Sequence, residues 1–130
     1  MIGLDTSAII DLFKGEEAVK NVLVSSKEAL SLTFISYLEL YFGLDSSNNR
    51  HREEGKYYDE FFSSLPAFEL SIESCQKASH IYWNLKKQGK TIDQFDCVIA
   101  SIFLANGVTK ILTRNRKHFE HINGLSVISY

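Results

Sequence analysis

The 130-residue sequence contains only one proline, two cysteines and seven glycines. With so little proline and glycine, and no stretch of low complexity, the chain offers no candidate linker between domains. No repeat with a period of some tens of residues is visible, so a repeat architecture is not indicated. A chain of this length with 45% hydrophobic residues can bury an ordinary core. We therefore predict a single domain over residues 1–130.

Long hydrophobic runs are also missing, and none approaches the roughly 18 residues that a membrane-spanning helix requires. Met1 is followed at once by the strand-like residues 2–5 (IGLD), which leave no room for the charged and apolar regions of a signal peptide. Cys75 and Cys97 lack CxxC spacing, and we predict that both pack as small buried hydrophobic residues rather than pair. The simplest expectation is a soluble cytoplasmic protein without a membrane partner.

The chain has no excess of positive charge, since 14 Lys and Arg residues stand against 16 Asp and Glu residues. Nucleic-acid-binding domains usually carry a basic surplus, so the net charge of −2 does not indicate such binding. The distribution is more informative than the sum. Basic residues gather in segments 50–56, 86–90 and 110–119. The first two segments are typical of solvated helix ends and loops.

Hydrophobic periodicity predicts strands that alternate with helices. Strands are expected over residues 1–4, 29–34, 67–71, 110–113 and 125–129, and helices over 6–13, 16–26, 36–44, 50–65, 74–88, from about 93, and 115–119. Strands separated by helices imply right-handed parallel crossovers and a sheet covered on both faces. The predicted fold class is therefore α/β, a three-layer α/β/α sandwich with a central parallel sheet of four to five strands.

Acidic residues stand where predicted strands end or helices begin. Asp5 follows the first strand, Glu39 lies in the helix after the second strand, and Asp96 lies in the first turn of a later helix. Each has an ordinary explanation, because a carboxylate near a helix N-terminus stabilises the free N–H groups and the dipole. Ser36 and Glu39 also have the spacing of a capping box.

Four side chains with oxygen ligands share this placement: Asp5, Glu39, Asp96 and Asn115. Since ligands bind beyond the carboxyl ends of parallel strands, we expect these groups to converge on one edge of the sheet. Ionised carboxylates that lie close together raise one another's pKa, and a hard divalent cation removes that repulsion. Oxygen ligands without His or Cys favour Mg²⁺ or Mn²⁺ over Zn²⁺. One or two such ions can activate water and stabilise the leaving oxygen in phosphodiester hydrolysis.

No other catalytic machinery competes with this acidic set. The sequence has no Ser-His-Asp set, no Gly-rich phosphate loop and no Cys nucleophile. The four His residues are scattered, and His118 and His121 have no acidic or Cys partner at metal-site spacing. We therefore predict that both lie on the surface.

In this order and spacing, the motifs resemble those of the PIN-domain family, and within it the VapC-type toxins of toxin–antitoxin modules. The matching segments span almost the whole chain: residues 2–13 (IGLDTSAIIDLF), 33–43 (TFISYLELYFG), 89–107 (GKTIDQFDCVIASIFLANG) and 111–129 (ILTRNRKHFEHINGLSVIS). The resemblance implies a Mg²⁺- or Mn²⁺-dependent endoribonuclease in which Asp5, Glu39 and Asp96 hold the metal and Asn115 assists. It also implies a small antitoxin as partner and a homodimer.

Several positions keep two interpretations open beside the resemblance. Asn115 stands where many relatives have a fourth Asp and others have Asn. Because a neutral amide binds a hard cation more weakly than a carboxylate does, the number of metal ions, one or two, is left open. Asp93 is either a helix cap or an outer-shell metal group. Thr6 either caps its helix, or orients Asp5, or binds the metal through a water molecule. Asp11 is expected to be an exposed helix residue.

A basic segment follows the fourth predicted strand and adjoins the expected metal site. It contains Arg114, Arg116 and Lys117. These cations would either bind the RNA backbone and offset its repulsion by the acids, or simply face the solvent.

Two other functions were weighed against the ribonuclease. A receiver-type signalling module also has acids around Mg²⁺ at strand ends, but it needs a Lys after a late strand, and here strand 110–113 runs into Arg114 and Asn115. A PIN fold that binds RNA or a protein without cutting remains open because of Asn115. The RNA, its cleavage site and the antitoxin are not specified by the sequence.

Overall fold

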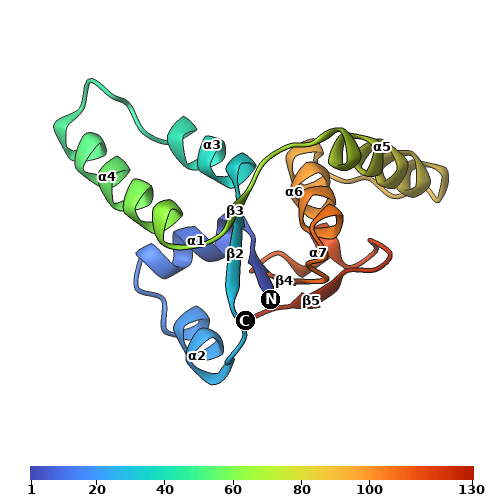
Figure 1. Cartoon of the computed structure of the whole chain (residues 1–130), viewed down its shortest axis with the longest axis horizontal. Coiled ribbons are helices and arrows are strands. Elements are labelled where there is room, and N and C mark those ends of the chain that lie inside the picture. Colours follow the sequence, from blue (N-terminus) through green and yellow to red (C-terminus); the bar gives the residue numbers. More distant parts are fainter.

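Five parallel strands form the centre of the computed structural model, which describes all residues from 1 to 130 (Figure 1). The strands are β1 (Ile2–Leu4), β2 (Leu30–Thr33), β3 (Ala67–Phe68), β4 (Lys110–Leu112) and β5 (Ser126–Ile128). They pair in the order β3-β2-β1-β4-β5, so the first strand of the chain is the middle strand of the sheet. Because all pairs are parallel, the carboxyl ends of the strands meet at one edge.

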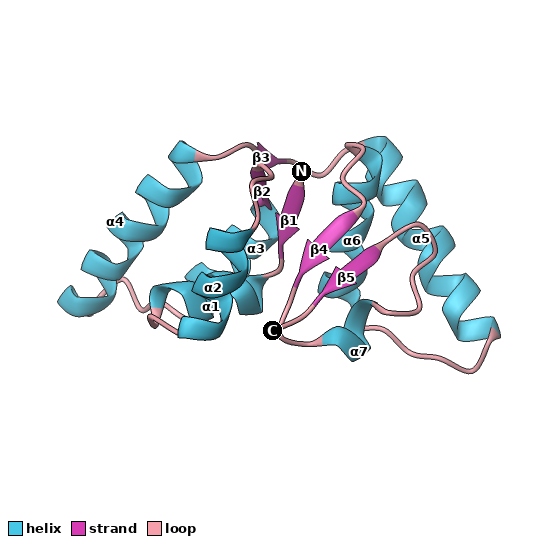
Figure 2. Cartoon of the chain, turned by 90° about the horizontal axis from the view of Figure 1, so that it is seen from below, coloured by secondary structure: helices cyan, strands magenta, loops and turns pink.

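Helices cover both faces of the sheet, as Figure 2 shows. They are α1 (Thr6–Phe13), α2 (Glu17–Ser25), α3 (Phe34–Phe42), α4 (Asn49–Ser64), α5 (Ile72–Lys87), α6 (Gln94–Ala105) and the short α7 (Arg116–Phe119). Helices α1, α2 and α4 lie on one side, and α5 and α6 on the other. The predicted α/β/α architecture is therefore confirmed.

Each face of the sheet has its own hydrophobic core. Leu112 of β4 packs with α1, α2 and α4 residues in one cluster, and its neighbour Ile111 packs with α5 and α6 residues in the other. This alternation follows from the period of two along a strand, which sends successive side chains to opposite faces. Strand β4 is buried on both faces for this reason, as a parallel sheet requires.

Gly3 brings α6 close to the middle strand. A Cβ atom at this position would lie 2.6 Å from the ring of Phe103, a buried α6 residue. The missing side chain therefore lets the aromatic ring pack directly on the β1 backbone. This contact sets the depth at which α6 lies against the sheet.

The predicted element boundaries hold with two informative exceptions. Helix α3 begins at Phe34 with Thr33 as its N-cap, and the Thr33 hydroxyl accepts a hydrogen bond of 3.3 Å from the Ser36 amide. The predicted Ser36–Glu39 capping box is therefore wrong, because β2 ends earlier than expected. Strand β3 spans two residues rather than 67–71, because a capping box between Ser71 and Ser74 starts α5.

The cysteine prediction was half right. Cys97 is buried and its thiol donates to the Ala78 carbonyl at 3.2 Å, whereas Cys75 is exposed. Burial raises the pKa of the Cys97 thiol. None of the seven helices has both the length and the apolar character needed to cross a membrane.

Candidate active site

Asp5 lies at the carboxyl end of β1, at the N-cap position of α1. Its side chain makes no capping hydrogen bond, so the interpretation of Asp5 as a simple cap is wrong. Its Oδ2 atom instead accepts hydrogen bonds from the hydroxyls of Ser7 at 2.7 Å and Thr113 at 2.8 Å. Both donors bind the same oxygen of this buried carboxylate, which leaves Oδ1 for another partner.

Glu39 reaches the same edge from the second turn of α3. Its Oε1 atom accepts a hydrogen bond of 2.7 Å from the hydroxyl of Thr6, the first residue of α1. That hydroxyl is also hydrogen-bonded to the Ser36 hydroxyl at 2.8 Å. Thr6 therefore contacts Glu39 rather than Asp5, and it joins α1 to α3.

Desolvation makes the charge on Glu39 costly. Burial raises the pKa of Glu39, and the negative charges of Asp5 and Asp93 raise it further, against the stabilising bond from Thr6. No Lys or Arg side chain forms an ion pair with this carboxylate. The residue is thus held in place by a neutral hydroxyl and keeps an uncompensated negative charge.

Asp93 and Asp96 divide two roles at the start of α6. Asp93 is the N-cap, and its Oδ1 atom accepts hydrogen bonds from the amides of Phe95 at 2.9 Å and Asp96 at 3.2 Å. Of the two interpretations of Asp93, the structure shows the helix cap. The Asp96 carboxylate does not cap the helix, and it contacts α7 through His118.

The Asp96 carboxylate has one basic neighbour. Its Oδ2 atom lies 2.8 Å from Nδ1 of His118. Burial raises the pKa of Asp96 to about 6; the nearby charge of Asp5 contributes to this rise and His118 opposes it. His118 lies on the surface, as predicted, but it has an acidic partner in space. The two residues stand 22 positions apart, so no local spacing could have revealed the pair.

The acids influence one another but do not form a closed ligand cage. Asp5 raises the pKa of both Glu39 and Asp96, which places all three carboxylates within one electrostatic neighbourhood. As the side chains stand, no three Asp, Glu, His or Cys residues are close enough together to hold one metal ion. The donor set nevertheless suits Mg²⁺ or Mn²⁺, because it consists of carboxylate oxygens with excess negative charge.

Asn115 follows β4 and joins this edge through its backbone. It is the N-cap of α7 but its side chain makes no capping bond. Its amide donates to the Thr113 hydroxyl at 3.0 Å, the same hydroxyl that donates to Asp5. The Asn115 backbone is therefore joined to Asp5 through the Thr113 hydroxyl, and its side chain does not cap the helix.

The basic segment divides into bound and free cations. The Arg114 guanidinium donates to Asp11 Oδ1 at 2.7 Å, and Arg116 donates to the Val127 carbonyl at 3.2 Å. Lys117 is exposed and forms no ion pair. These side chains line an open hollow together with their neighbours: Arg114, Asn115, Arg116, Lys117, His118 and Glu120.

Asp11 is not the exposed residue that the sequence suggested. It is 3% exposed, and besides Arg114 it accepts a hydrogen bond of 2.6 Å from the Tyr130 hydroxyl. The prediction failed because both partners come from the last fifth of the chain. Burial, and the neighbouring charge of Asp11, raise the pKa of the Tyr130 hydroxyl.

Known proteins match most of the chain. A model of the PIN domain family matches residues 2–125. Ribonuclease VapC3 of Methanocaldococcus jannaschii is 33% identical over 100 residues, which cover 77% of this chain and 95% of that protein. The tRNA(fMet)-specific endonuclease VapC of Shigella flexneri is 24% identical over 94% of this chain and 92% of its own. The structure of VapBC-1 from nontypeable Haemophilus influenzae superposes with a TM-score of 0.82 at 28% identity, over 99% of this chain and 98% of that one.

Proposed function

The chain belongs to the PIN-domain family, and on this premise we propose that it is a Mg²⁺- or Mn²⁺-dependent endoribonuclease, the toxin of a type II toxin–antitoxin pair. The proposed ligands are Asp5, Glu39 and Asp96, with Asn115 assisting. The observation that carries the proposal is the shared electrostatics of these acids at one sheet edge, where the raised pKa values of Glu39 and Asp96 indicate uncompensated negative charge. A bound divalent cation supplies a Lewis acid that activates water and offsets phosphate charge.

The protein's own contribution is to hold each carboxylate in a fixed orientation. Hydroxyls bind one oxygen of Asp5 and one of Glu39, and a ring nitrogen binds one oxygen of Asp96. Hydrogen bonds of this kind fix which oxygen of each carboxylate is left for a metal ion. Closure of the three acids around the ion still requires side-chain movement, since no three-residue cage stands ready.

The substrate proposed for this site is RNA. Without a cation, the phosphate backbone would be repelled by Asp5, Glu39 and Asp96. Lys117 lines the same hollow as His118, the partner of Asp96, and forms no ion pair, whereas the guanidinium of Arg114 is paired with Asp11. Phosphate contacts of this type position a nucleic acid without reading its sequence.

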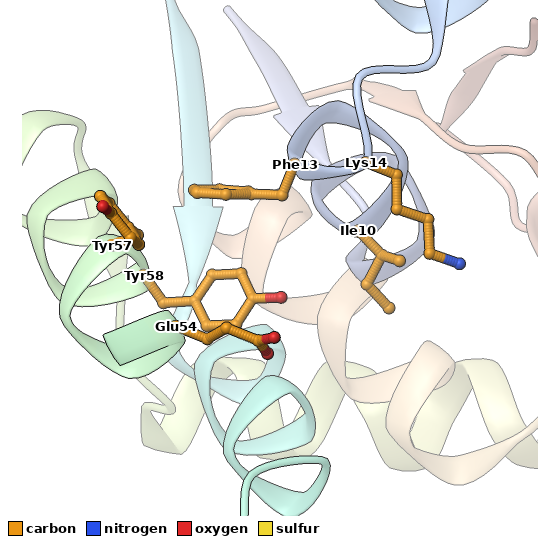
Figure 3. A pocket seen from close by; sticks show the side chains of 6 residues that line it. All are labelled: Ile10, Phe13, Lys14, Glu54, Tyr57 and Tyr58. Atoms are coloured by element: carbon orange, nitrogen blue, oxygen red, sulfur yellow. The ribbon is translucent and has the colours of Figure 1, made fainter. Parts of the chain in front are cut away.

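A candidate binding groove for the proposed antitoxin lies between α1 and α4 (Figure 3). This groove is lined by Ile10, Phe13, Lys14, Glu54, Tyr57 and Tyr58. Phe13 and Tyr57 are 41% and 60% exposed, and the ring of Phe13 meets that of Tyr58 edge-on at 4.8 Å. Exposed aromatic residues of this kind are typical anchors for an amphipathic segment of a partner.

A test of this groove co-expresses the chain with a candidate antitoxin, a small protein encoded directly upstream of it. Replacing Phe13 by Glu is expected to abolish co-purification of the small partner, because a buried charge would face its apolar side. The matched control is Glu16→Gln, outside the groove, which should leave the pair intact. Undiminished capture by Phe13→Glu would place the partner elsewhere.

The proposed homodimer would cover a second apolar surface. Phe42 at the end of α3 is 70% exposed, and its ring stacks on Phe95 of α6 with centroids 6.5 Å apart. Leu38, one turn earlier on α3, is also exposed. Light scattering on the purified toxin is expected to give twice the monomer mass of 14.8 kDa, and Phe42→Glu should return the monomer.

The catalytic proposal is tested with purified toxin and single-stranded RNA, with Mg²⁺ or with EDTA. Wild-type protein should cleave only with the metal, and Asp96→Asn should abolish cleavage while the circular dichroism spectrum stays unchanged. Retained Mg²⁺-dependent cleavage by Asp96→Asn would remove this residue from the site. Two results together would instead support a non-catalytic PIN fold. The wild type would bind RNA without cleaving it, and a calorimetric titration with Mg²⁺ would show no heat of binding.

A further inference from the structure

Of the three proposed ligands, only Asp96 pairs with a basic side chain, and that side chain is His118. Its Nδ1 atom lies 2.8 Å from Oδ2 of Asp96, whereas neither Asp5 nor Glu39 forms an ion pair with any Lys, Arg or His. The contact therefore calls for a functional account of its own.

The backbone that carries His118 is fixed on both sides. The His118 amide donates to the Asn115 carbonyl at 3.0 Å, and the next residue, Phe119, is fully buried in the core beneath α5 and α6. The imidazole is half exposed, so burial does not demand its presence at this position. A side chain on a rigid backbone, with one nitrogen aimed at a carboxylate, is well placed to orient that carboxylate.

The three acids share one pattern of hydrogen bonding. Protein donors bind a single oxygen of each: Oδ2 of Asp5, Oε1 of Glu39 and Oδ2 of Asp96. The other oxygen of each carboxylate is left for an outside partner. Serine and threonine hydroxyls perform this task at Asp5 and Glu39, and His118 performs it at Asp96.

We infer that His118 is a positioning residue of the proposed active site: its Nδ1–H group donates to Oδ2 of Asp96 and leaves Oδ1 to a divalent cation. This inference rests on the proposed function. An ionised carboxylate only accepts hydrogen bonds, so Nδ1 must carry the hydrogen when both groups are in their neutral-pH forms. Outer partners of metal ligands fix ligand orientation, and their removal typically lowers metal affinity or activity by about 10- to 100-fold.

The test measures Mn²⁺ binding to the full-length protein by isothermal titration calorimetry. His118→Leu removes the donor, and its dissociation constant for Mn²⁺ is expected to rise by about 10- to 100-fold. His118→Asn keeps an amide N–H near the place of Nδ1 and should restore affinity to within about threefold of the wild type. The matched control is His121→Leu, since His121 is similarly exposed but pairs only with Glu120 at 3.5 Å, and it should bind as the wild type does.

A spectroscopic readout examines the hydrogen bond without changing His118. In wild-type protein at about pH 8, ¹⁵N shifts of the ring should show the hydrogen on Nδ1, because the partner of one nitrogen sets the tautomer. Asp96→Asn should shift the ring toward the Nε2–H form that a free imidazole prefers. A wild-type ring with its hydrogen on Nε2 would overturn the inference.

The outcomes separate the inference from the function on which it rests. Wild-type Mn²⁺ affinity in His118→Leu, or tighter binding in that variant, would overturn the positioning role while the ribonuclease proposal stands. A wild type that neither binds Mn²⁺ nor cleaves RNA would overturn the proposed function itself. Mn²⁺ binding that is weak in both His118→Leu and His118→Asn would also count against a role through the Nδ1–H donor. This holds if both variants unfold at the wild-type temperature in EDTA.

Discussion

At the scale of single residues, Asp96 occupies surroundings that make its negative charge costly. Burial and the charge of Asp5 raise the pKa of Asp96 from 3.8 to about 6. The native state therefore holds this proton more tightly than the unfolded chain does. The stabilisation that comes from protonated Asp96 is complete below about pH 4 and is lost as the pH rises through about 6.

This shift predicts that Asp96→Asn stabilises the metal-free protein at neutral and alkaline pH. In EDTA at about pH 8, the free energy of unfolding should rise by about 1–3 kcal/mol, since the costly charge is gone. The gain should shrink at about pH 5, where most of the wild-type carboxyl is protonated. Urea denaturation at both pH values checks this, and a less stable variant at pH 8 would contradict it.

Arg114 is predicted to support the fold rather than to bind RNA. Arg114→Gln leaves the buried Asp11 carboxylate with only the Tyr130 hydroxyl, and the free energy of unfolding should fall by about 1–3 kcal/mol. Mn²⁺ affinity should not change. The control Arg116→Gln, whose exposed guanidinium meets a backbone carbonyl, should change stability by less than about 0.5 kcal/mol. Lost RNA affinity with unchanged stability in Arg114→Gln would reverse the assignment.

Some residue-level features could be predicted from the sequence and others could not. Asp5, Glu39 and Asp96 could be proposed as a cluster because each stands near a predicted strand end or helix start, and in the structure the charge of Asp5 raises the pKa of the other two. The partners of His118 and Asp11, and the burial of Asp11, were missed because these partners lie 22 and more than 100 positions away along the chain. Hydrophobic periodicity reports which face of an element is buried, and it carries no information on polar pairs between distant elements.

At the scale of elements, the packing of α6 on β1 depends on Gly3. Strand β1 is hydrogen-bonded to neighbours on both sides and cannot move away from the helix. An added methyl group would clash with the buried Phe103 ring, so Gly3→Ala should lower the free energy of unfolding by about 1–3 kcal/mol.

Chemical denaturation of Gly3→Ala measures this cost. The matched control is Gly43→Ala at the C-cap of α3, where φ is −85° and an added Cβ would lie 3.3 Å from the Leu40 carbonyl oxygen, a milder contact than at Gly3. That change should cost less than about 1 kcal/mol. A Gly3→Ala protein as stable as the wild type would show that α6 is free to shift outward.

The elements themselves were predictable because their signals are local. Pro66 ends α4, and the alternation of strand and helix patterns gave the parallel sheet. The start of α3 was misplaced because Thr33 and Ser36 both have good capping chemistry, and only the length of β2 decides between them. Strand order is a tertiary property, and local patterns do not contain it.

At the scale of the whole molecule, the parallel topology gathers acids from three separate segments at one edge, while the total charge stays near zero. Divalent cation binding should therefore stabilise the native state as a whole, because the unfolded chain does not assemble these ligands. Mn²⁺ at about 100 times its dissociation constant should add about 2.7 kcal/mol to the free energy of unfolding. Asp5→Asn and Asp96→Asn should lose most of this gain in a thermal shift assay.

The most direct measurement of the shared metal site is anomalous diffraction from crystals grown with Mn²⁺. We predict one or two peaks at the carboxyl edge of the sheet, with oxygens from at least two of Asp5, Glu39 and Asp96 about 2.0–2.4 Å from a peak. Well-occupied Mn²⁺ elsewhere in the crystal, with no peak among these three carboxylates, would contradict the central claim.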